Sequence, residues 1–209
     1  MKISKGGKLL ILGIALVVID QVFKFLVKTN MSIGESFNVL GDWFRIVFVE
    51  NEGMAFGMAF GGAVGKFCLS LFRVCLCAGL IWWISSLAKK DNVPTGFLVG
   101  LTLITAGAAG NIVDCLFYGL IFSASAPGVV ASLGGHYAPF MFGKVVDMLY
   151  FPIINTTWPQ WMPWVGGTPF TFFDPVFNFA DSCVTVGAFY LILFQWKYIS
   201  SGDKKEKKK

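Results

Sequence analysis

The sequence predicts an all-α membrane bundle of four transmembrane helices, with a small surface sheet and a long outer loop. The chain of 209 residues is 56% hydrophobic and only 14% charged, whereas an ordinary soluble domain is about 25% charged. Its mean hydropathy is +0.68. The apolar residues gather in runs long enough to cross a hydrocarbon core, which takes about 20 helical residues. Lysines flank the ends of these runs.

The four predicted spans cover about residues 9–27, 67–88, 97–120 and 179–196, and the last is the shortest. The first span follows several lysines and could be taken for a secretory signal peptide. No small-x-small cleavage site follows it, however, and the chain continues with Asp20-Gln-Val-Phe-Lys24. We therefore expect an uncleaved first transmembrane helix.

The lysines also predict the orientation, because Lys and Arg are retained on the cytoplasmic side of short loops. Both termini are predicted to be cytoplasmic, with outer loops at about residues 28–66 and 121–178. Residues 1–199 then form one membrane domain and residues 200–209 a basic cytoplasmic tail. The net charge of +5 is a topology signal, so no nucleic-acid partner is expected. The residues on the cytoplasmic side are eleven of the 17 basic ones: Lys2, Lys5, Lys8, Lys89, Lys90, Lys197, Lys204, Lys205, Lys207, Lys208 and Lys209.

The cysteines and the single histidine indicate neither a disulfide framework nor a metal site. The cysteines lie within or beside predicted spans, where a thiol behaves as a small hydrophobic group. Because His136 is the only histidine, no zinc-binding set can be assembled. We expect neither a metal nor another cofactor. The five cysteines are Cys68, Cys75, Cys77, Cys115 and Cys183.

The two outer loops have different patterns. Residues 44–50 alternate polar and apolar side chains, which indicates a β-strand, and Asn51-Glu-Gly53 predicts a turn. A small sheet on the membrane surface fits this pattern. The region 121–176 is rich in aromatic residues and proline. Its rings either lie at the lipid headgroup level or form a small extramembrane core of their own.

Several polar residues lie inside the spans or at their ends, where a charge is costly unless it is paired. Asp20 and Lys24 lie at i and i+4 on the first predicted helix and can form an ion pair. This pair is either a structural salt bridge that holds the helix to its neighbours or part of a functional interior. In the third span, the small residues 106–110 permit close helix packing. Asn111 and Asp114 follow near its outer end.

Asp147 and Asp181 are the candidate catalytic pair. The predicted topology places them, with Asn51 and Asn178, on the outer side at comparable depth. Every acid of this polar set except Asp20 is therefore expected to converge on one outer mouth. Two neighbouring carboxylates cannot both ionise cheaply, so they share one proton, and one acts as general base while the other acts as general acid. Such a pair can activate water and protonate a leaving amine, which is amide hydrolysis without a metal or a covalent nucleophile.

Other chemistries fit the sequence less well. Ser182 has only the distant His136 as a partner for nucleophilic catalysis. A phosphatase would need clustered arginines, and the chain has only Arg45 and Arg73. Two non-peptidase alternatives remain open. A proton-coupled transporter predicts broken helices and acids at the bilayer midplane, and a non-catalytic scaffold would use the polar set only to lock helix packing.

These motifs together resemble the lipoprotein signal peptidase family, the bacterial signal peptidase II enzymes. The resemblance implies a peptidase domain over residues 1–199, with four transmembrane helices and a small extracytoplasmic β-cradle. It implies an aspartyl endopeptidase of the bacterial inner membrane, with its active site at the outer face. Such an enzyme removes the signal peptide from diacylglyceryl-modified prolipoproteins by cleaving before the lipidated cysteine. Membrane lipids and globomycin-like cyclic peptide inhibitors are the other partners that the resemblance implies. The segments that carry it are Asp20-Gln-Val-Phe-Lys24, Asn51-Glu-Gly-Met-Ala-Phe56, Gly107-Ala-Ala-Gly-Asn-Ile-Val-Asp114, Val145-Val-Asp147 and Phe177-Asn-Phe-Ala-Asp181.

By this resemblance, Asp147 and Asp181 match the catalytic aspartates. Many family members have an arginine where this chain has Cys115, and Arg73 and Lys66 are the candidate substitutes. The connections 119–145 and 147–181 are longer than usual, which we expect to enlarge the lid over the substrate groove. The positions that match supporting motif residues are Asn51, Gly53, Asn111, Asp114, Asn178 and Ala180, together with Asp20 and Lys24 of the first helix.

Overall fold

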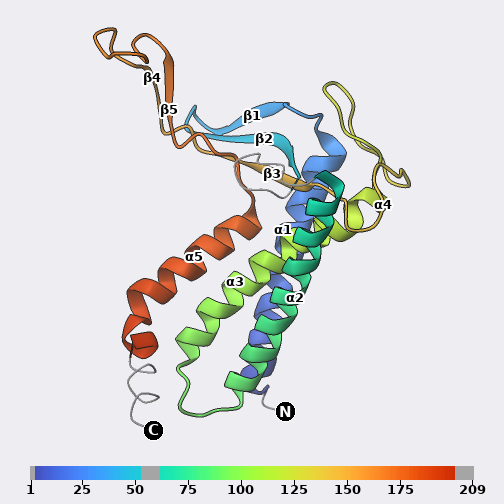
Figure 1. Ribbon diagram of the computed structural model, residues 1–209, viewed down its shortest axis with the longest axis vertical. Coiled ribbons are helices and arrows are strands. Elements are labelled where there is room, and N and C mark those ends of the chain that lie inside the picture. The colour runs from blue at the N-terminus through green and yellow to red at the C-terminus, as the bar shows by residue number, and fades with distance from the viewer. Residues whose placement is uncertain (1–2, 53–61, 201–209) are drawn as a thin grey trace.

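The computed structural model describes residues 3–52 and 62–200. Long helices lie side by side and a small sheet covers one end of them (Figure 1). Helix α1 begins and helix α5 ends at the end opposite the sheet (Figure 1). The bundle consists of α1 (Lys5–Asn30), α2 (Gly62–Ala88), α3 (Thr95–Val113) and α5 (Phe179–Phe194).

Three described helices are long and apolar enough to cross a membrane: Lys5–Asn30, Gly62–Ala88 and Thr95–Ile121. The third consists of α3, a π-helical turn η2 (Asp114–Tyr118) and the short α4 (Gly119–Ile121). Helix α5 is apolar but only 16 residues long, so length and composition identify three spans among the described residues, one fewer than predicted. The lysine-rich end of the predicted tail, residues 201–209, lies outside the described residues.

The connections between the helices contain β-structure, so the label all-α is too narrow for this chain. Strands β1 (Ser36–Leu40), β2 (Phe44–Asn51) and β3 (Val145–Tyr150) form one antiparallel sheet in the order β1-β2-β3. Strand β2 confirms the strand predicted at residues 44–50. Because a sheet edge cannot remain unpaired in hydrocarbon, this sheet lies at the end of the bundle rather than within it.

The aromatic region forms a separate hairpin of β4 (Ile154–Thr157) and β5 (Pro169–Phe172). The hairpin projects away from the helices (Figure 1). The rings of Trp158 and Phe170 contact each other with centroids 4.5 Å apart, whereas Trp164 is fully exposed. The hairpin therefore has one aromatic contact between its strands and an exposed aromatic tip, but none of residues 154–172 is buried.

Glycines bring α3 very close to its neighbours. A Cβ atom on Gly107 would lie 2.3 Å from the carbonyl oxygen of Ala180 in α5, and one on Gly110 would lie 2.6 Å from a carboxylate oxygen of Asp20 in α1. These contacts confirm the close packing expected from residues 106–110. They also allow short polar side chains on three helices to reach one another.

Two buried clusters hold the architecture together, one at each end of the bundle. The cluster beneath the sheet attaches β2 and β3 to the C-terminal end of α1, and it thereby fixes the position of Asp147. Its members are Val27, Met31, Phe48, Tyr118, Phe122, Ala131, Val146 and Met148. The cluster at the opposite end consists of Leu9, Ile84, Val93, Phe97, Leu98, Leu101 and Leu191.

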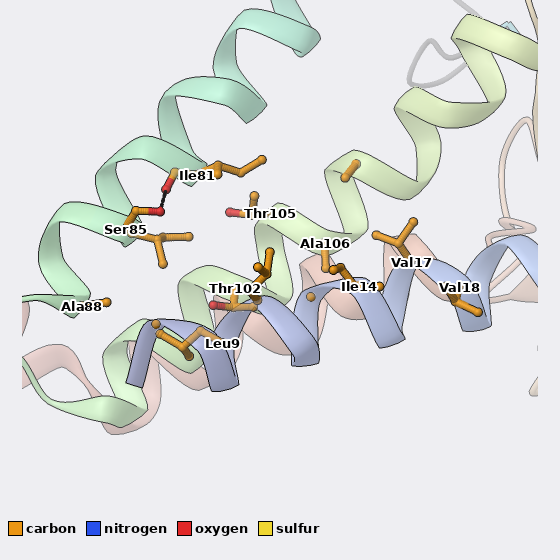
Figure 2. Close-up of a pocket in the computed structure, with 15 residues that line it drawn as sticks. Leu9, Ile14, Val17, Val18, Ile81, Ser85, Ala88, Thr102, Thr105 and Ala106 are labelled. Atoms are coloured by element: carbon orange, nitrogen blue, oxygen red, sulfur yellow. Dashed lines mark hydrogen bonds between the residues drawn. The ribbon is translucent and has the colours of Figure 1, made fainter. Parts of the chain in front are cut away.

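An apolar cleft of about 310 Å³ lies between α1, α2 and α3. Figure 2 shows Leu9 and Ile14 from α1 and Ile81 from α2 around it. The hydroxyls of Ser85 and Thr102 donate to carbonyls of their own helices, at 2.7 and 2.8 Å. The cleft therefore offers an apolar lining.

Candidate active site

The N-terminus of α5 fixes the position of Asp181. Asn178 is the N-cap of this helix, and its side-chain oxygen accepts a hydrogen bond from the Asp181 amide at 2.9 Å. In return, Oδ2 of Asp181 accepts from the Asn178 amide at 3.2 Å. This reciprocal pair is a capping box. It holds the Asp181 carboxylate at the helix terminus, where the helix dipole favours a negative charge.

Strand β3 fixes the position of Asp147. Its ladder partner on β2 is Val49, and the residue is only 5% exposed. Oδ1 of Asp147 accepts from the side-chain amide of Asn178 at 2.7 Å, and Oδ2 accepts from that of Asn51 at 3.4 Å. Burial and, second, the negative charge of Asp181 raise the pKa of Asp147 to about 7.

Two asparagine side chains connect the carboxylates. The amide nitrogen of Asn178 donates both to Asp147 and, at 3.0 Å, to Oδ1 of Asn111. The amide nitrogen of Asn111 donates to Oδ1 of Asp181 at 2.8 Å. Four predicted site residues are therefore brought together from α3, β3 and α5. A raised carboxyl pKa beside a second carboxylate is the arrangement that general acid–base chemistry requires.

Lys24 of α1 contacts this set of two aspartates and two asparagines through Asn111, and it is completely buried. Its ammonium contacts Asp20 at 2.9 Å, Asp114 at 2.8 Å and Oδ1 of Asn111 at 2.7 Å. These three acceptors match the three N–H donors of an ammonium group. The predicted pairing of Asp20 with Lys24 is confirmed, and the contacts support its structural interpretation.

Asp20 was expected to lie apart from the other acids, and this expectation is wrong. Its Oδ1 accepts from the backbone amide of Ala180 at 2.9 Å, so it reaches the first turn of α5. Asp114 similarly accepts from the backbone amide of Val146, the residue before Asp147, at 3.2 Å. The close approach of α1 and α3 at Gly110 lets Asp20 join the network, a contact that spacing along a single helix does not reveal.

Two further residues belong to the network although they were not among the predicted site residues. The side-chain amide of Gln21 donates to Asp20 at 3.1 Å and to Asp114 at 2.9 Å. The hydroxyl of Tyr118 donates to the side-chain oxygen of Gln21 at 3.1 Å. The available signal for Gln21 was its polarity inside an apolar span, next to Asp20.

The remaining predicted positions are less informative. Gly53 lies outside the described residues, as does the rest of its motif through Phe56. Cys115 is buried, and Arg73 and Lys66 both lie within electrostatic range of it. Across residues 3–52 and 62–200, no three acidic, His or Cys side chains gather in a metal-binding arrangement.

An apolar groove of about 840 Å³ adjoins the polar network. Its wall includes Met148 and Leu149, which follow Asp147, and Phe179, which follows Asn178. Helix α1 contributes Phe23, Leu26, Val27, Asn30 and Met31, and strands β1 and β2 contribute Phe37, Val39, Phe44 and Ile46. The cleft in Figure 2 is separate. Ala109 lines it, and Asn111 lies about 200° further around α3.

Comparison with known proteins identifies relatives over nearly the whole chain. The family model described as signal peptidase (SPase) II matches residues 12–197. The lipoprotein signal peptidase of Porphyromonas gingivalis is 46% identical over 195 residues, which are 92% of this chain and 84% of the relative. That of Amoebophilus asiaticus is 39% identical over 185 residues, 87% and 75% of the two chains. A solved bacterial membrane enzyme, determined by the in meso method at 2.3 Å resolution, has the same fold. Its TM-score is 0.58 at 24% identity, over 93% of this chain and 91% of that one.

Proposed function

This chain belongs to the signal peptidase II family and removes signal peptides from prolipoproteins, and from this premise we propose that it is an aspartic endopeptidase with Asp147 and Asp181 as its catalytic pair. Family membership sets aside the transporter and scaffold alternatives. The observation that carries the proposal is the connection of both carboxylates through the amides of Asn178 and Asn111. Asn51, Gly53, Asp114, Ala180, Asp20 and Lys24 are proposed as supporting residues.

The two aspartates have different roles in this proposal. Asp147 holds the shared proton, since its pKa is raised to about 7. Asp181 is the general base and lies at the N-terminus of α5, where the helix dipole favours a negative charge. It takes a proton from water, whose oxygen attacks the scissile carbonyl. The proton of Asp147 then passes to the departing nitrogen, leaving a free amino group on the mature lipoprotein and a carboxylic acid on the signal peptide, and the proton that Asp181 took from water returns to Asp147.

The substrate that fits this site is a peptide whose cysteine carries a diacylglyceryl group, cleaved just before that cysteine. The apolar groove beside Met148, Leu149 and Phe179 would hold the acyl chains. Burying them contributes about 0.8 kcal/mol per CH₂. The carboxylates at the end of this groove would then meet the peptide bond next to the lipid.

We further propose a four-span arrangement in the bacterial inner membrane. The 16 residues of α5 extend about 24 Å, slightly less than the roughly 30 Å of hydrocarbon, so α5 would be the fourth and shortest span. Both termini would be cytoplasmic, in keeping with the lysine distribution, and the sheet and the catalytic pair would lie at the outer face. Surrounding membrane lipids and globomycin-like cyclic peptides, as inhibitors, are the proposed partners besides the substrate.

Asp147→Asn and Asp181→Asn test this proposal in purified enzyme with a diacylglyceryl prolipoprotein as substrate. Each variant keeps the size of the side chain but removes proton transfer, so we expect cleavage to fall at least about 100-fold. Asp174→Asn is the matched control because Asp174 is exposed and bonds to Tyr150 instead. Full activity in either variant of the pair would refute the assignment.

A further inference from the structure

The ladder between β2 and β3 has two chemically different faces. Side chains alternate along a strand, and the register pairs Val49 with Asp147 and Glu50 with Val146. Asn51 lies two residues beyond Val49, so it shares the face of Asp147 and donates to its Oδ2 at 3.4 Å. The side chain of Glu50 lies on the face of the ladder opposite to Asp147, with its ion-pair partners Lys28 and Lys144. Whatever fixes Glu50 therefore also fixes the next residue, Asn51, against Asp147.

Glu50 is anchored on its buried side by Lys28. The two side chains form an ion pair. Lys28 is 0% exposed, and the side chain of Glu50 is only 5% exposed. The ammonium also donates to the hydroxyl of Ser125 at 2.9 Å and lies 4.9 Å from the ring centroid of Tyr137. The rings of Phe48 and Phe122 are within 6 Å, so this pair is well shielded from water.

Further ion pairs continue from Glu50 toward the surface. Lys144 lies 3.6 Å from Glu50 and 3.7 Å from Glu52, and Glu52 also pairs with Lys66 of α2. Lys28, Glu50, Lys144, Glu52 and Lys66 form a continuous set, here named the charge chain. It joins α1, β2, the start of β3 and α2, and the two glutamates flank Asn51 on both sides.

The long connection between α4 and β3 contacts two lysines of the charge chain, Lys28 and Lys144. Ser125 and Tyr137 both come from this connection. The hydroxyl of Tyr137 also accepts the backbone N–H of Lys144 at 2.8 Å. Residues of this connection thus help to enclose the buried ion pair.

We propose that Glu50 is a positioning residue, which the charge chain uses to hold the amide of Asn51 against Asp147. This inference rests on the proposed function, because Asp147 must be catalytic for it to matter. A buried ion pair is weak evidence for stability, since an apolar pair of similar size is often as stable. An ion pair with fixed partners does, however, define the position of the backbone that carries it.

The test is a mutational cycle between the charge chain and Asn51. The double variant Lys28→Met/Glu50→Gln removes the buried pair without leaving either charge alone. We expect kcat to fall about tenfold, with little change in KM. Asn51→Ala removes the amide itself and lowers kcat about 10- to 100-fold, the range for losing a hydrogen bond to a charged group. The triple variant is expected to match Asn51→Ala alone, because the charge chain acts through that amide.

The pH dependence of kcat provides a second readout that a purely structural role would not change. The charged groups that face Asp147 are Asp181 from α5 and Lys24 from α1, and both are retained. Loss of the Asn51 hydrogen bond disfavours ionised Asp147, so the basic limb of the profile moves to higher pH in the double variant, as in Asn51→Ala. An unchanged profile, or losses that multiply in the triple variant, would overturn the proposal.

Lys144→Met provides a second test because the Lys144 side chain is 36% exposed and its loss leaves the buried pair intact. We expect Lys144→Met to lower kcat several-fold in the parent protein but to have no further effect when combined with Asn51→Ala. If Lys144→Met alone keeps the kcat of the parent, the proposal is contradicted. Arg45→Met is the control, since Arg45 lies on β2 of the same sheet but pairs with Asp42 of the β1–β2 turn, outside the charge chain. If Asp147→Asn remains active, the proposed function is refuted. If Asp147→Asn is inactive but the charge-chain variants keep the parental kcat, only the positioning role of Glu50 is refuted.

Discussion

Removing the titratable carboxyl of Asp147 should stabilise the protein at neutral and alkaline pH. In the folded protein, burial and Asp181 raise its pKa from the ordinary 3.8 to about 7. The folded state therefore binds more protons than the unfolded state between these values, and stability must fall as the pH rises through this range. Asp147→Asn keeps the shape of the side chain but cannot ionise, so it escapes this loss.

The magnitude follows from the two pKa values. A rise from 3.8 to about 7 corresponds to about 4 kcal/mol of unfolding free energy, lost in full only above pH 7. The variant recovers less than this. Its amide nitrogen would face the donor group of Asn51 or Asn178, an unfavourable contact that offsets about 1–2 kcal/mol. We therefore expect a net gain of about 2 kcal/mol at pH 8 and, because the unfavourable contact remains when the ionisation gain is nearly absent, a net loss of about 1 kcal/mol at pH 4.

Thermal unfolding of both proteins in the same detergent, from pH 4 to pH 8, measures this difference. The midpoint of Asp147→Asn should rise above that of the parent as the pH increases. Asp42→Asn is the control, because the side chain of Asp42 is 87% exposed, and its difference from the parent should not grow with pH. A constant difference for Asp147→Asn across the range would refute the reasoning, as would a loss of stability at pH 8.

Three other predictions concern packing, charge and substrate size. Lys24→Met should lower the unfolding free energy by about 3–5 kcal/mol, because it leaves buried carboxylates without their cation; denaturant unfolding measures this, and a loss below 1 kcal/mol would contradict it. Gly107→Ala should lower the thermal midpoint, since its Cβ would lie 2.3 Å from a backbone oxygen and overpacking costs about 1–3 kcal/mol. Gly79→Ala has open space around its Cβ and should be neutral or stabilising; equal effects at the two glycines would count against the packing argument. Leu26→Trp narrows the groove of about 840 Å³, so KM should rise for a diacylglyceryl peptide and stay unchanged for the same peptide without lipid. A parallel rise for both peptides would exclude the groove as the acyl site.

The helices and the strand β2 could be predicted because their signals are local. Apolar runs of sufficient length identify α1, α2 and α3 directly, and alternation identifies β2. Helix α5 was harder to classify, since its length of 16 residues lies below that of a typical span. The strands β4 and β5 were not predicted, because Pro159 and Pro163 and the many aromatic side chains obscure any alternation in their region.

The residues of the candidate site could be predicted from the sequence, but the hydrogen bonds that connect them could not. Motif resemblance identified Asp147, Asp181 and the asparagines, yet it did not reveal that Asn178 serves both as the α5 N-cap and as a donor to Asp147. Gln21 escaped notice for a similar reason. Its partners lie on α3, and contacts between residues so far apart in sequence depend on how closely two helices pack, which Gly110 decides.

The charges around Asp147 and Asp181, the proposed catalytic pair, explain why this pair should share one proton. Lys24 is a buried cation linked to the pair through Asn111, and its three donors are taken by Asp20, Asp114 and Asn111. In residues 3–52 and 62–200, the hydrogen bonds to the carboxylates of Asp147 and Asp181 come instead from amides. An amide dipole stabilises a carboxylate, but it does not cancel the repulsion between two of them. The charge of Lys24 is thus directed to Asp20 and Asp114, and the proposed catalytic pair is left with one proton to share.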